Sequence, residues 1–503
     1  MIPMKRLCLI RQSMKCLRTL FVLITQCQTS TRKRIMALEH IVFLLTLLPI
    51  PILVYLAKRN TDVRDEFGGK TYGRFAVGIS AAATGNSGFI MTGAVGLGYA
   101  YGLQWILLPL SWLIGDLIFW KYGPKKLNGY CSKNNLSNVV EVISGKGGKP
   151  SSYLFIFTLI FVITLLSAYI SSQWLAGAKI ITGFVDIEPE LAIVLFGGFV
   201  SAYCIVGKYR GSVYTDLYQG LLMLIVTTLS LYLVFSLDNT IQTGLDDSFY
   251  SITGSMSAIS VLVFVFGYLT ASIGFGFGQL QVTSRYISAK DPVEAENARW
   301  IYILFLQYTW IGMTLFGVIL RQKSFQVIDP EAALIPFFHE NAGAILTGVA
   351  VAGIFAAIAS TVDSIIISIT NLIKSKSTSF IKSHKFVEPL TIFSIAIVTV
   401  GFSIQSNSSV FSIALISISM IGGVLAGPII IRLYDFKHTD WSLFISIVTS
   451  CIGCIMWRVN GLSSIINEAV IGIGLSFVAN YFAYLSIATK NENQGPKGEV
   501  EKG

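Results

Sequence analysis

The chain has 503 residues, of which 53% are hydrophobic and only 13% are charged, and it carries a formal net charge of +10. This composition excludes a soluble globular protein and predicts an all-α polytopic membrane protein surrounded by lipid. Most Lys and Arg residues lie between apolar stretches, so the positive charge reflects membrane topology and does not indicate a nucleic-acid partner.

Thirteen apolar stretches are long enough to cross a bilayer as helices. They cover residues 37–57, 72–98, 101–120, 151–178, 189–207, 212–236, 255–281, 298–320, 342–373, 386–404, 409–433, 440–457 and 464–487. Residues 1–35 form a basic extension whose apolar run is too short to span. We therefore expect a transmembrane domain over residues 36–488 and a cytoplasmic tail over residues 489–503.

Basic residues alternate between rich and poor loops along the chain. One set of alternate loops holds 25 of the 37 Lys and Arg residues, and the opposite set holds only four. Because basic loops stay cytoplasmic, this predicts an external N-terminus and a cytoplasmic C-terminus, in the plasma (cell inner) membrane. The eight basic residues of 1–35 fall on the wrong side, so we hypothesise that translation begins at Met36. The alternative is a basic targeting segment.

Two of the spans contain residues that interrupt a helix. Residues 80–89 read SAAATGNSGF, and residues 273–279 read IGFGFGQ. Each glycine weakens a helix by about 1 kcal/mol, and unwound backbone at membrane depth is tolerated only where it is buried or lines a cavity. Each break opens a set of five spans, 72–236 and 255–433, which indicates an inverted-repeat transporter with a site at mid-membrane. The alternative is that the glycines only allow close helix packing.

The span over residues 342–373 carries a row of hydroxyl side chains. On a helix, Ala357, Ser360, Thr361 and Ser364 fall on one face, and Asp363 lies beside it. A carboxylate near the membrane centre costs roughly 2.5–3.5 kcal/mol, so Asp363 requires a partner or an ion. The hydroxyls alone are explained by bonds within their own helix or by packing. Together with Asp363 they indicate a cation site.

Several motifs, taken in order, resemble the sodium:solute symporter family, which includes sodium/proline, sodium/pantothenate, sodium/sialic acid and sodium/glucose transporters. They are residues 197–199 (GGF) with 214–220 (YTDLYQG), residues 277–279 (FGQ) with 285–286 (RY) and 298–300 (ARW), and residues 356–361 (AAIAST). The resemblance implies a LeuT-type core of five plus five helices, with one span before it and two after it. It also implies a secondary active transporter that imports a small organic solute coupled to sodium by alternating access.

Motif matching also implies which residues bind the coupling ion. The sodium site would use the carbonyls of Ala83, Asn86 and Ala357 and the hydroxyls of Ser360 and Thr361. A second cation site, which some family members hold, matches Asp216, Asp363 and Ser364 together with Ser360. Two carboxylates there would strengthen cation binding, or their repulsion would let a proton bind instead. The competing interpretation of Asp216 is a carboxylate that caps an exposed helix start.

The solute is expected between the two breaks. Candidate lining residues are Ser87, Phe89, Ser172, Gln173, Tyr268, Phe275 and Gln279. Gly85 stands where sodium/proline symporters carry an Asp, and the positions that shape the proline pocket also differ, so proline is not the expected solute.

Two alternatives to sodium symport stay open, a proton-coupled or uncoupled carrier and a membrane sensor with a transporter fold. The sensor is disfavoured because only a short polar tail follows the last span. No nucleophile–base or metal-ligand set is evident in the sequence, so we do not expect an enzyme.

Overall fold

The computed structural model describes residues 38–59, 70–145, 152–237, 244–376, 386–405 and 410–493. Within these ranges the regular structure is helical, and one isolated bridge joins Tyr72 to Ala289. The predicted all-α class is therefore confirmed. The predicted extension over residues 1–35 lies outside the described residues.

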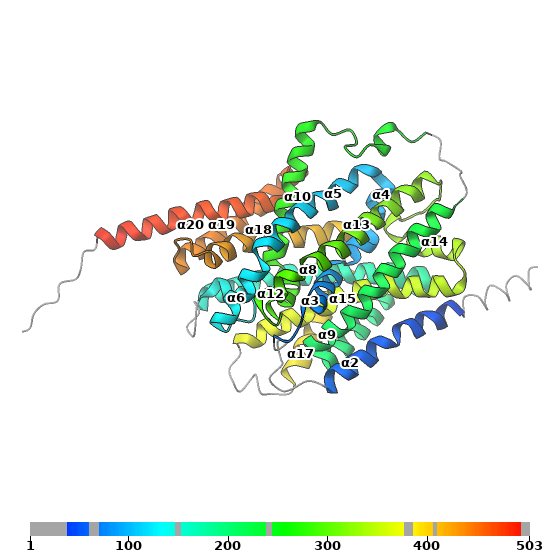
Figure 1. Cartoon of the computed structure of the whole chain (residues 1–503), viewed down its shortest axis with the longest axis horizontal. Coiled ribbons are helices and arrows are strands. Elements are labelled where there is room, and N and C mark those ends of the chain that lie inside the picture. Colours follow the sequence, from blue (N-terminus) through cyan, green and yellow to red (C-terminus); the bar gives the residue numbers. More distant parts are fainter. Residues whose placement is uncertain are drawn as a thin grey trace, which may run out of the picture.

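The helices in chain order are α2 (Pro49–Arg59), α3 (Arg74–Gly85), η1 (Phe89–Ala94), α4 (Val95–Tyr101), η2 (Leu103–Ile106), α5 (Leu107–Tyr122), α6 (Pro124–Asn134), α7 (Val139–Ser144), α8 (Ser152–Phe184), α9 (Pro189–Ser236), η3 (Asp247–Tyr250), α10 (Ala258–Gly278), α11 (Leu280–Ile287), α12 (Pro292–Asn297), α13 (Arg299–Gln322), η4 (Pro330–Ala332), α14 (Leu334–Asn341), α15 (Ala344–Lys376), α17 (Val387–Ile404), α18 (Val410–Leu433), α19 (Asp440–Val459), η5 (Leu462–Ser464) and α20 (Glu468–Asn493). Figure 1 shows them packed into one bundle.

Eleven helical segments in the described part of the chain are long and apolar enough to cross a membrane. The predicted spans 189–207 and 212–236 are both helical, and they meet at a kink at Lys208, where φ is 52° and ψ is −154°; the label α9 covers both segments. The predicted span 72–98 is divided among α3, η1 and α4. The number thirteen therefore stays a prediction.

The first predicted break is present. Helix α3 ends at Gly85, Asn86 leaves helical geometry with φ −86° and ψ 72°, and the π-helical turn η1 begins at Phe89. A Cβ atom on Gly88 would lie 2.8 Å from Cβ of Ala176 in α8. Glycine at this point therefore both weakens the helix and lets the unwound backbone press against α8.

The second break is also present, and it is shorter. Helix α10 ends at Gly278, Gln279 is extended with φ −77° and ψ 108°, and α11 begins at Leu280. Cβ atoms on Gly274 and Gly278 would each lie 3.0 Å from backbone atoms of α18. The glycines here serve close packing as well as the break, so the two interpretations of this segment are compatible.

Helix α15 lies at the centre of the bundle and packs against α3, α8, α9 and α11. In an apolar stretch of 18 residues within the span Ala344–Ser375, 83% of the residues are buried. In the corresponding stretch of the span Glu468–Ile487, only 17% are buried. Figure 1 accordingly places α20 along one edge of the molecule and α2 along another. Most side chains of this span are therefore held away from lipid.

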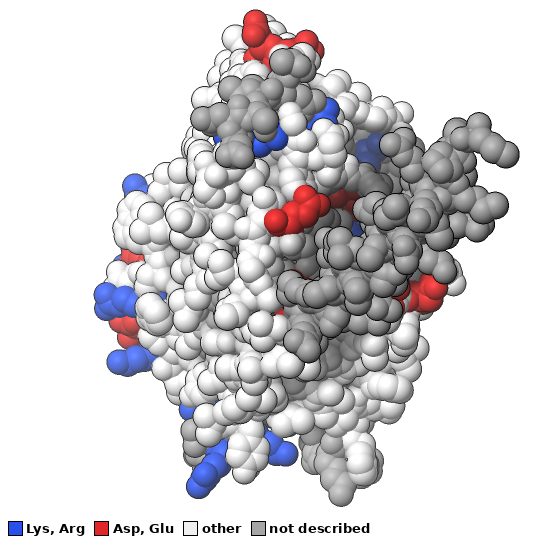
Figure 2. Space-filling view, turned by 90° about the vertical axis from the view of Figure 1, so that its right-hand side faces the viewer, with Lys and Arg blue, Asp and Glu red and all other residues white. Residues whose placement is uncertain are grey.

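The outer surface is apolar where lipid would surround it. Large hydrophobic side chains are more than 60% exposed at Leu44, Tyr232, Ile259, Leu304 and Phe482. Figure 2 shows a face made mostly of uncharged residues, on which Lys, Arg, Asp and Glu form small separate groups. This surface is that of a multi-pass membrane protein.

Candidate functional site

The broken α3 meets α15 at adjacent hydroxyl groups. Thr361 Oγ1 donates a hydrogen bond of 3.0 Å to the carbonyl oxygen of Thr84, and Thr84 Oγ1 lies 3.0 Å from Ser364 Oγ. The carbonyl that Thr361 contacts thus belongs to Thr84, the residue that follows the predicted ligand Ala83. Ala83, Asn86 and Ala357 are also fully buried in this part of the bundle.

Asn86, inside the first break, is unsatisfied. Its side chain is fully buried, yet neither Oδ1 nor Nδ2 has a hydrogen-bond partner. A buried polar group without a partner costs about 1–3 kcal/mol, so such a group calls for an explanation. The break therefore holds polar atoms that suit an ion, a water or a polar solute.

Asp216 joins the hydroxyl row of α15 to the first core helix. Its Oδ1 accepts a hydrogen bond from Ser360 Oγ at 2.5 Å, and its Oδ2 accepts one from Ser80 Oγ at 2.5 Å. The carboxylate is fully buried about two turns beyond the bend at Lys208. The interpretation of Asp216 as an exposed capping residue is therefore wrong, because the residue is fully buried and lies well inside the second helical segment of α9.

The predicted second cation site contains a cation that the chain itself supplies. Arg285 Nη2 lies 3.1 Å from Asp216 Oδ2, and the guanidinium stands over the ring of Tyr209 at 4.9 Å. The same Nη2 donates to Ser212 Oγ at 2.7 Å and also to Ser364 Oγ. Ser212 and Ser364 in turn donate to Asp363.

Asp363 is satisfied by hydroxyl groups. Its Oδ2 accepts from Tyr203 Oη at 2.9 Å, and its Oδ1 accepts from Ser212 at 2.8 Å and from Ser364 at 3.0 Å. The structure thus brings Asp216, Asp363 and Ser364 together, but around a guanidinium. With both carboxylates ionised, the group carries one negative charge in excess.

The predicted solute-lining residues near the first break mostly hold the break in place. Gln173 Oε1 accepts a hydrogen bond from the backbone N–H of Gly88 at 2.9 Å, and its Nε2 donates to Ser172 Oγ. Tyr169 donates to Ser87 Oγ at 3.0 Å. These bonds satisfy backbone and hydroxyl groups that the unwound helix leaves free.

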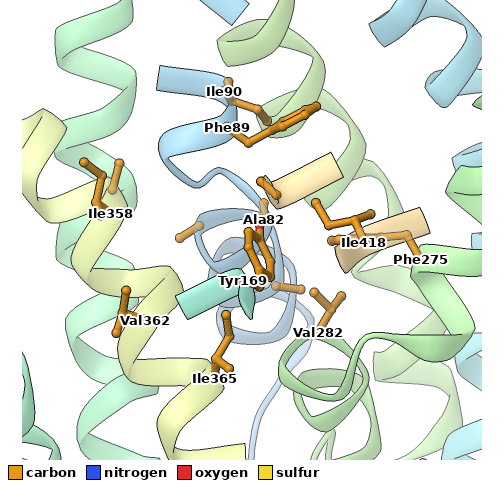
Figure 3. Packing of buried hydrophobic residues seen from close by; sticks show 14 of the residues in the cluster. Ala82, Phe89, Ile90, Tyr169, Phe275, Val282, Ile358, Val362, Ile365 and Ile418 are labelled. Atoms are coloured by element: carbon orange, nitrogen blue, oxygen red, sulfur yellow. The ribbon is translucent and has the colours of Figure 1, made fainter. Parts of the chain in front are cut away.

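Two predicted aromatic residues belong to one group of rings. Phe89 packs edge-to-face on Trp310 at 5.4 Å, and Phe275 packs on Trp112 at the same distance. Trp112 also contacts Trp310 at 5.5 Å. Figure 3 shows Phe89 and Phe275 reaching the core from two different segments, with Ile418 beside Phe275 and with Ala82 and Tyr169 below Phe89 in this view.

The remaining predicted lining residues are placed differently. Gln279 Nε2 donates to the carbonyl of Ile418 at 3.4 Å, and its Oε1 accepts from Gln281 at 3.0 Å, so its polar atoms serve the second break. Tyr268 is half-buried about two turns before Phe275 in α10, and its ring packs on Phe264. Tyr268 is therefore not brought into the aromatic group.

A cavity of about 170 Å³ approaches the charged group. Its lining includes Ser284 of α11, Ser288 directly after that helix, Ser368 of α15, Tyr209 and Lys70. Tyr209 is the residue beneath the Arg285 guanidinium. Lys70 precedes α3 and donates to Ser132, and partial burial lowers the pKa of its ammonium group.

Sequence reasoning missed two charged residues. Arg285 lies within a motif but was assigned no role, and Asp116 lies within the predicted span 101–120. Asp116 is only 1% exposed and accepts a hydrogen bond from Ser272 Oγ at 2.8 Å. Since an ionisable residue inside a membrane span is by itself a functional signal, both residues could have been found.

The chain is similar to known transporters over most of its length. Residues 67–448 match the family described as the sodium:solute symporter family. The high-affinity proline transporter PutP of Bacillus subtilis (strain 168) is 23% identical over 461 residues, which cover 87% of this chain and 95% of the relative. The osmoregulated proline transporter OpuE of the same organism is 24% identical over 461 residues, which cover 87% and 92%.

The fold has solved counterparts. The substrate-bound, outward-open structure of a Na+-coupled sialic acid symporter has a TM-score of 0.73 at 18% identity, covering 89% of this chain and 98% of that one. Mhp1, a nucleobase-cation-symport-1 family transporter, has a TM-score of 0.53 at 13% identity, covering 84% and 94%. These likenesses confirm the predicted LeuT-type fold.

Proposed function

Because the chain belongs to the sodium:solute symporter family, we propose that it imports a small organic solute coupled to Na+ by alternating access. The observation that carries this proposal is the contact between the broken α3 and the hydroxyl row of α15, where Thr361 bonds the carbonyl of Thr84 at 3.0 Å. Unwound backbone at that depth frees carbonyl oxygens, and hydroxyls beside them complete an oxygen-lined cation site.

Sodium binds, in this proposal, to the carbonyls of Ala83, Asn86 and Ala357 and to the hydroxyls of Ser360 and Thr361. Carbonyl and hydroxyl oxygens replace the water shell of a hard cation without a directly bound carboxylate. Asp216 supports this site through its hydrogen bond with Ser360 and does not bind the ion itself. Because Ser360 Oγ donates its hydrogen bond to Asp216 Oδ1 at 2.5 Å, the lone pairs of that hydroxyl oxygen are left for the ion.

The transport cycle follows from the arrangement of rigid and broken helices. The bundle that contains α3 and α10 moves against a scaffold that contains α15, and the solute leaves past Asp216 and Arg285. The cavity bordered by Lys70 and Tyr209 supports this exit route. We place the protein in the plasma membrane with this side facing the cytoplasm, because Lys70 belongs to the loops rich in basic residues.

The membrane potential supplies part of the driving force. One positive charge that moves inward across 100 mV gains about 2.3 kcal/mol, which corresponds to roughly a fiftyfold solute gradient. The membrane potential therefore favours inward movement of Na+ and of the solute coupled to it.

Proton coupling is the second candidate function. The observation that favours it is the excess negative charge of the group formed by Asp216, Asp363 and Arg285, which one proton would neutralise. Sodium at the neighbouring hydroxyl site would neutralise the same charge. The two functions therefore differ in whether Na+ itself binds.

Thermal unfolding of the purified full chain in NaCl and in KCl tests the proposal. We expect NaCl to raise the midpoint of unfolding of the wild type, and Ser360→Ala and Thr361→Ala to lower the apparent Na+ affinity at least tenfold. Thr370→Ala is the matched control, since this hydroxyl bonds the carbonyl of Ile366 in its own helix at 2.8 Å. An unchanged Na+ response in both site variants would overturn the assignment. No Na+ response in the wild type, with stabilisation by low pH, would favour the proton.

A further inference from the structure

Asp116 in α5 is a buried carboxylate with one oxygen left over. It is 1% exposed, its Oδ1 accepts the hydrogen bond from Ser272, and its Oδ2 has no partner. Among the described residues no Lys or Arg forms an ion pair with it. An intramembrane carboxylate without a counter-charge is strongly disfavoured, so Asp116 holds a proton unless a positively charged ligand lies beside it.

Aromatic rings lie along the same contact between α5 and α10. Trp112 precedes Asp116 by four residues, so both project from one face of α5, about one helical turn apart. Phe275 follows Ser272 by three residues on the facing helix, and the pairs Asp116–Ser272 and Trp112–Phe275 form successive contacts between the two helices. The carboxylate is therefore held within about one helical turn, roughly 5–6 Å, of an aromatic surface.

This aromatic surface extends to both breaks. We call Phe89, Trp112, Phe275 and Trp310 the aromatic group; its members contact one another at ring distances of 5.4–5.5 Å. Phe89 is the first residue of η1, directly after the first break, and Phe275 lies three residues before Gly278, where α10 ends. A Cβ atom on Gly85 would lie 3.9 Å from Phe275 Cζ. The aromatic group thus occupies the region between the breaks.

One polar atom of the aromatic group is also unsatisfied. Trp112 Nε1 is buried and has no hydrogen-bond partner. Together with Asp116 Oδ2 it gives one face of α5 a donor and an acceptor that have no hydrogen-bond partner in the described part of the chain. Two such atoms four residues apart indicate a ligand that carries both charge and polar groups.

We propose that Asp116 and the aromatic group bind the positively charged nitrogen of the transported solute, which is therefore a small zwitterion or cation with an ammonium or quaternary ammonium group. The carboxylate supplies the counter-charge, and the ring faces attract a cation through their quadrupoles. This inference rests on the proposed function, since it names the solute class for the same transporter. It also separates the two positive ligands, sodium at α15 and the solute nitrogen at α5.

Binding to the purified full chain in NaCl tests the inference. The probes are proline, glycine betaine and choline, and 3,3-dimethylbutanol serves as the uncharged carbon analogue of choline. We expect at least one ammonium probe to stabilise the wild type against heat and the carbon analogue not to do so. Asp116→Asn is expected to lower the affinity for that probe at least tenfold while leaving the response to Na+ alone unchanged.

A second variant protects the test against misfolding of the first. Trp112→Leu keeps the carboxylate and removes the central ring, and we expect it to lower the affinity for the same ammonium probe while the Na+ response stays. Ser272→Ala, which removes only a hydrogen bond to Asp116, is expected to have a smaller effect than either.

Three outcomes would overturn the inference. They are no binding of any ammonium probe, equal binding by wild type and Asp116→Asn, and a loss of the Na+ response in Asp116→Asn, which would make Asp116 an ion ligand. The proposed function fails separately, through an unchanged Na+ response in Ser360→Ala and Thr361→Ala.

Discussion

Two aspartates buried in this bundle differ in how many of their oxygen atoms have a partner in the chain. Asp216 accepts hydrogen bonds from Ser80 and Ser360 and faces the guanidinium of Arg285 at 3.1 Å. Asp116 accepts one hydrogen bond, from Ser272, and its second oxygen has no partner. A carboxylate whose partners belong to the chain contributes to the structure of the bundle, whereas one that lacks partners is prepared for a ligand.

The largest expected effect is the loss of the internal cation. Arg285→Gln leaves Asp216 and Asp363 buried without a counter-charge, so we expect it to lower the stability by about 3–5 kcal/mol, measured as thermal or denaturant unfolding in detergent. Arg74→Gln is the control, because Arg74 forms its ion pair with Glu294 at the exposed surface, where such a pair contributes little to stability. Adding Asp363→Asn to Arg285→Gln should restore part of the loss. Equal stabilities of the two arginine variants would contradict a structural role for this charged group.

The next effect compares the two aspartates directly. Asp216→Asn removes the direct partner of Arg285, and we expect it to cost about 3 kcal/mol. Asp116→Asn removes a charge that has no partner in the chain, so the ligand-free protein should keep its stability or gain up to about 1 kcal/mol. Unfolding midpoints of both variants, measured side by side without solute, give the comparison. A larger loss for Asp116→Asn would show that Asp116 is structural.

Removing one hydrogen bond within the satisfied group should have a moderate effect. Tyr203→Phe deletes the 2.9 Å bond to Asp363, which keeps its bonds from Ser212 and Ser364. We expect a loss of about 1.5 kcal/mol, the value typical of a hydrogen bond to a charged group. Tyr232→Phe on the exposed surface should change nothing. A Tyr203 variant as stable as that control would show that the hydrogen bonds from Ser212 and Ser364 alone are enough to hold Asp363.

The smallest effect on stability is expected inside the first break. The side-chain amide of Asn86 has no partner, so Asn86→Ala should change the ligand-free stability by less than about 1 kcal/mol. Its effect should appear in binding, as a lower apparent affinity for Na+ or for solute in the same thermal assay. A large loss of stability with unchanged binding would mean that Asn86 supports the break and not a ligand.

Local sequence features predicted most of the fold. The apolar stretches located the membrane helices, and the glycines of residues 85–88 and 274–278 located both breaks, because helix propensity and hydrophobic length act over a few residues. The division of α9 was also visible, because the basic residues at 208 and 210 lie at the kink between its two helical segments.

The site was predicted less completely, because it depends on how distant segments face one another. The family resemblance predicted that Ser360 and Thr361 lie beside the first break. It did not predict that Thr361 contacts the carbonyl of Thr84, because this depends on which face α3 turns toward α15. The contact of Arg285 with Ser212 and Ser364 joins three segments far apart in sequence. The charge of Asp116 was visible in the sequence, but its lack of partners required the packing of α5 on α10.

Equilibrium binding of radioactive sodium to the purified wild type, Ser360→Ala and Thr370→Ala tests the central claim most directly. Saturable binding to the wild type and to Thr370→Ala, with at least tenfold weaker binding to Ser360→Ala, is the result expected if Na+ lies where the broken α3 meets α15. Equal sodium binding by all three proteins, or none by the wild type, would contradict it.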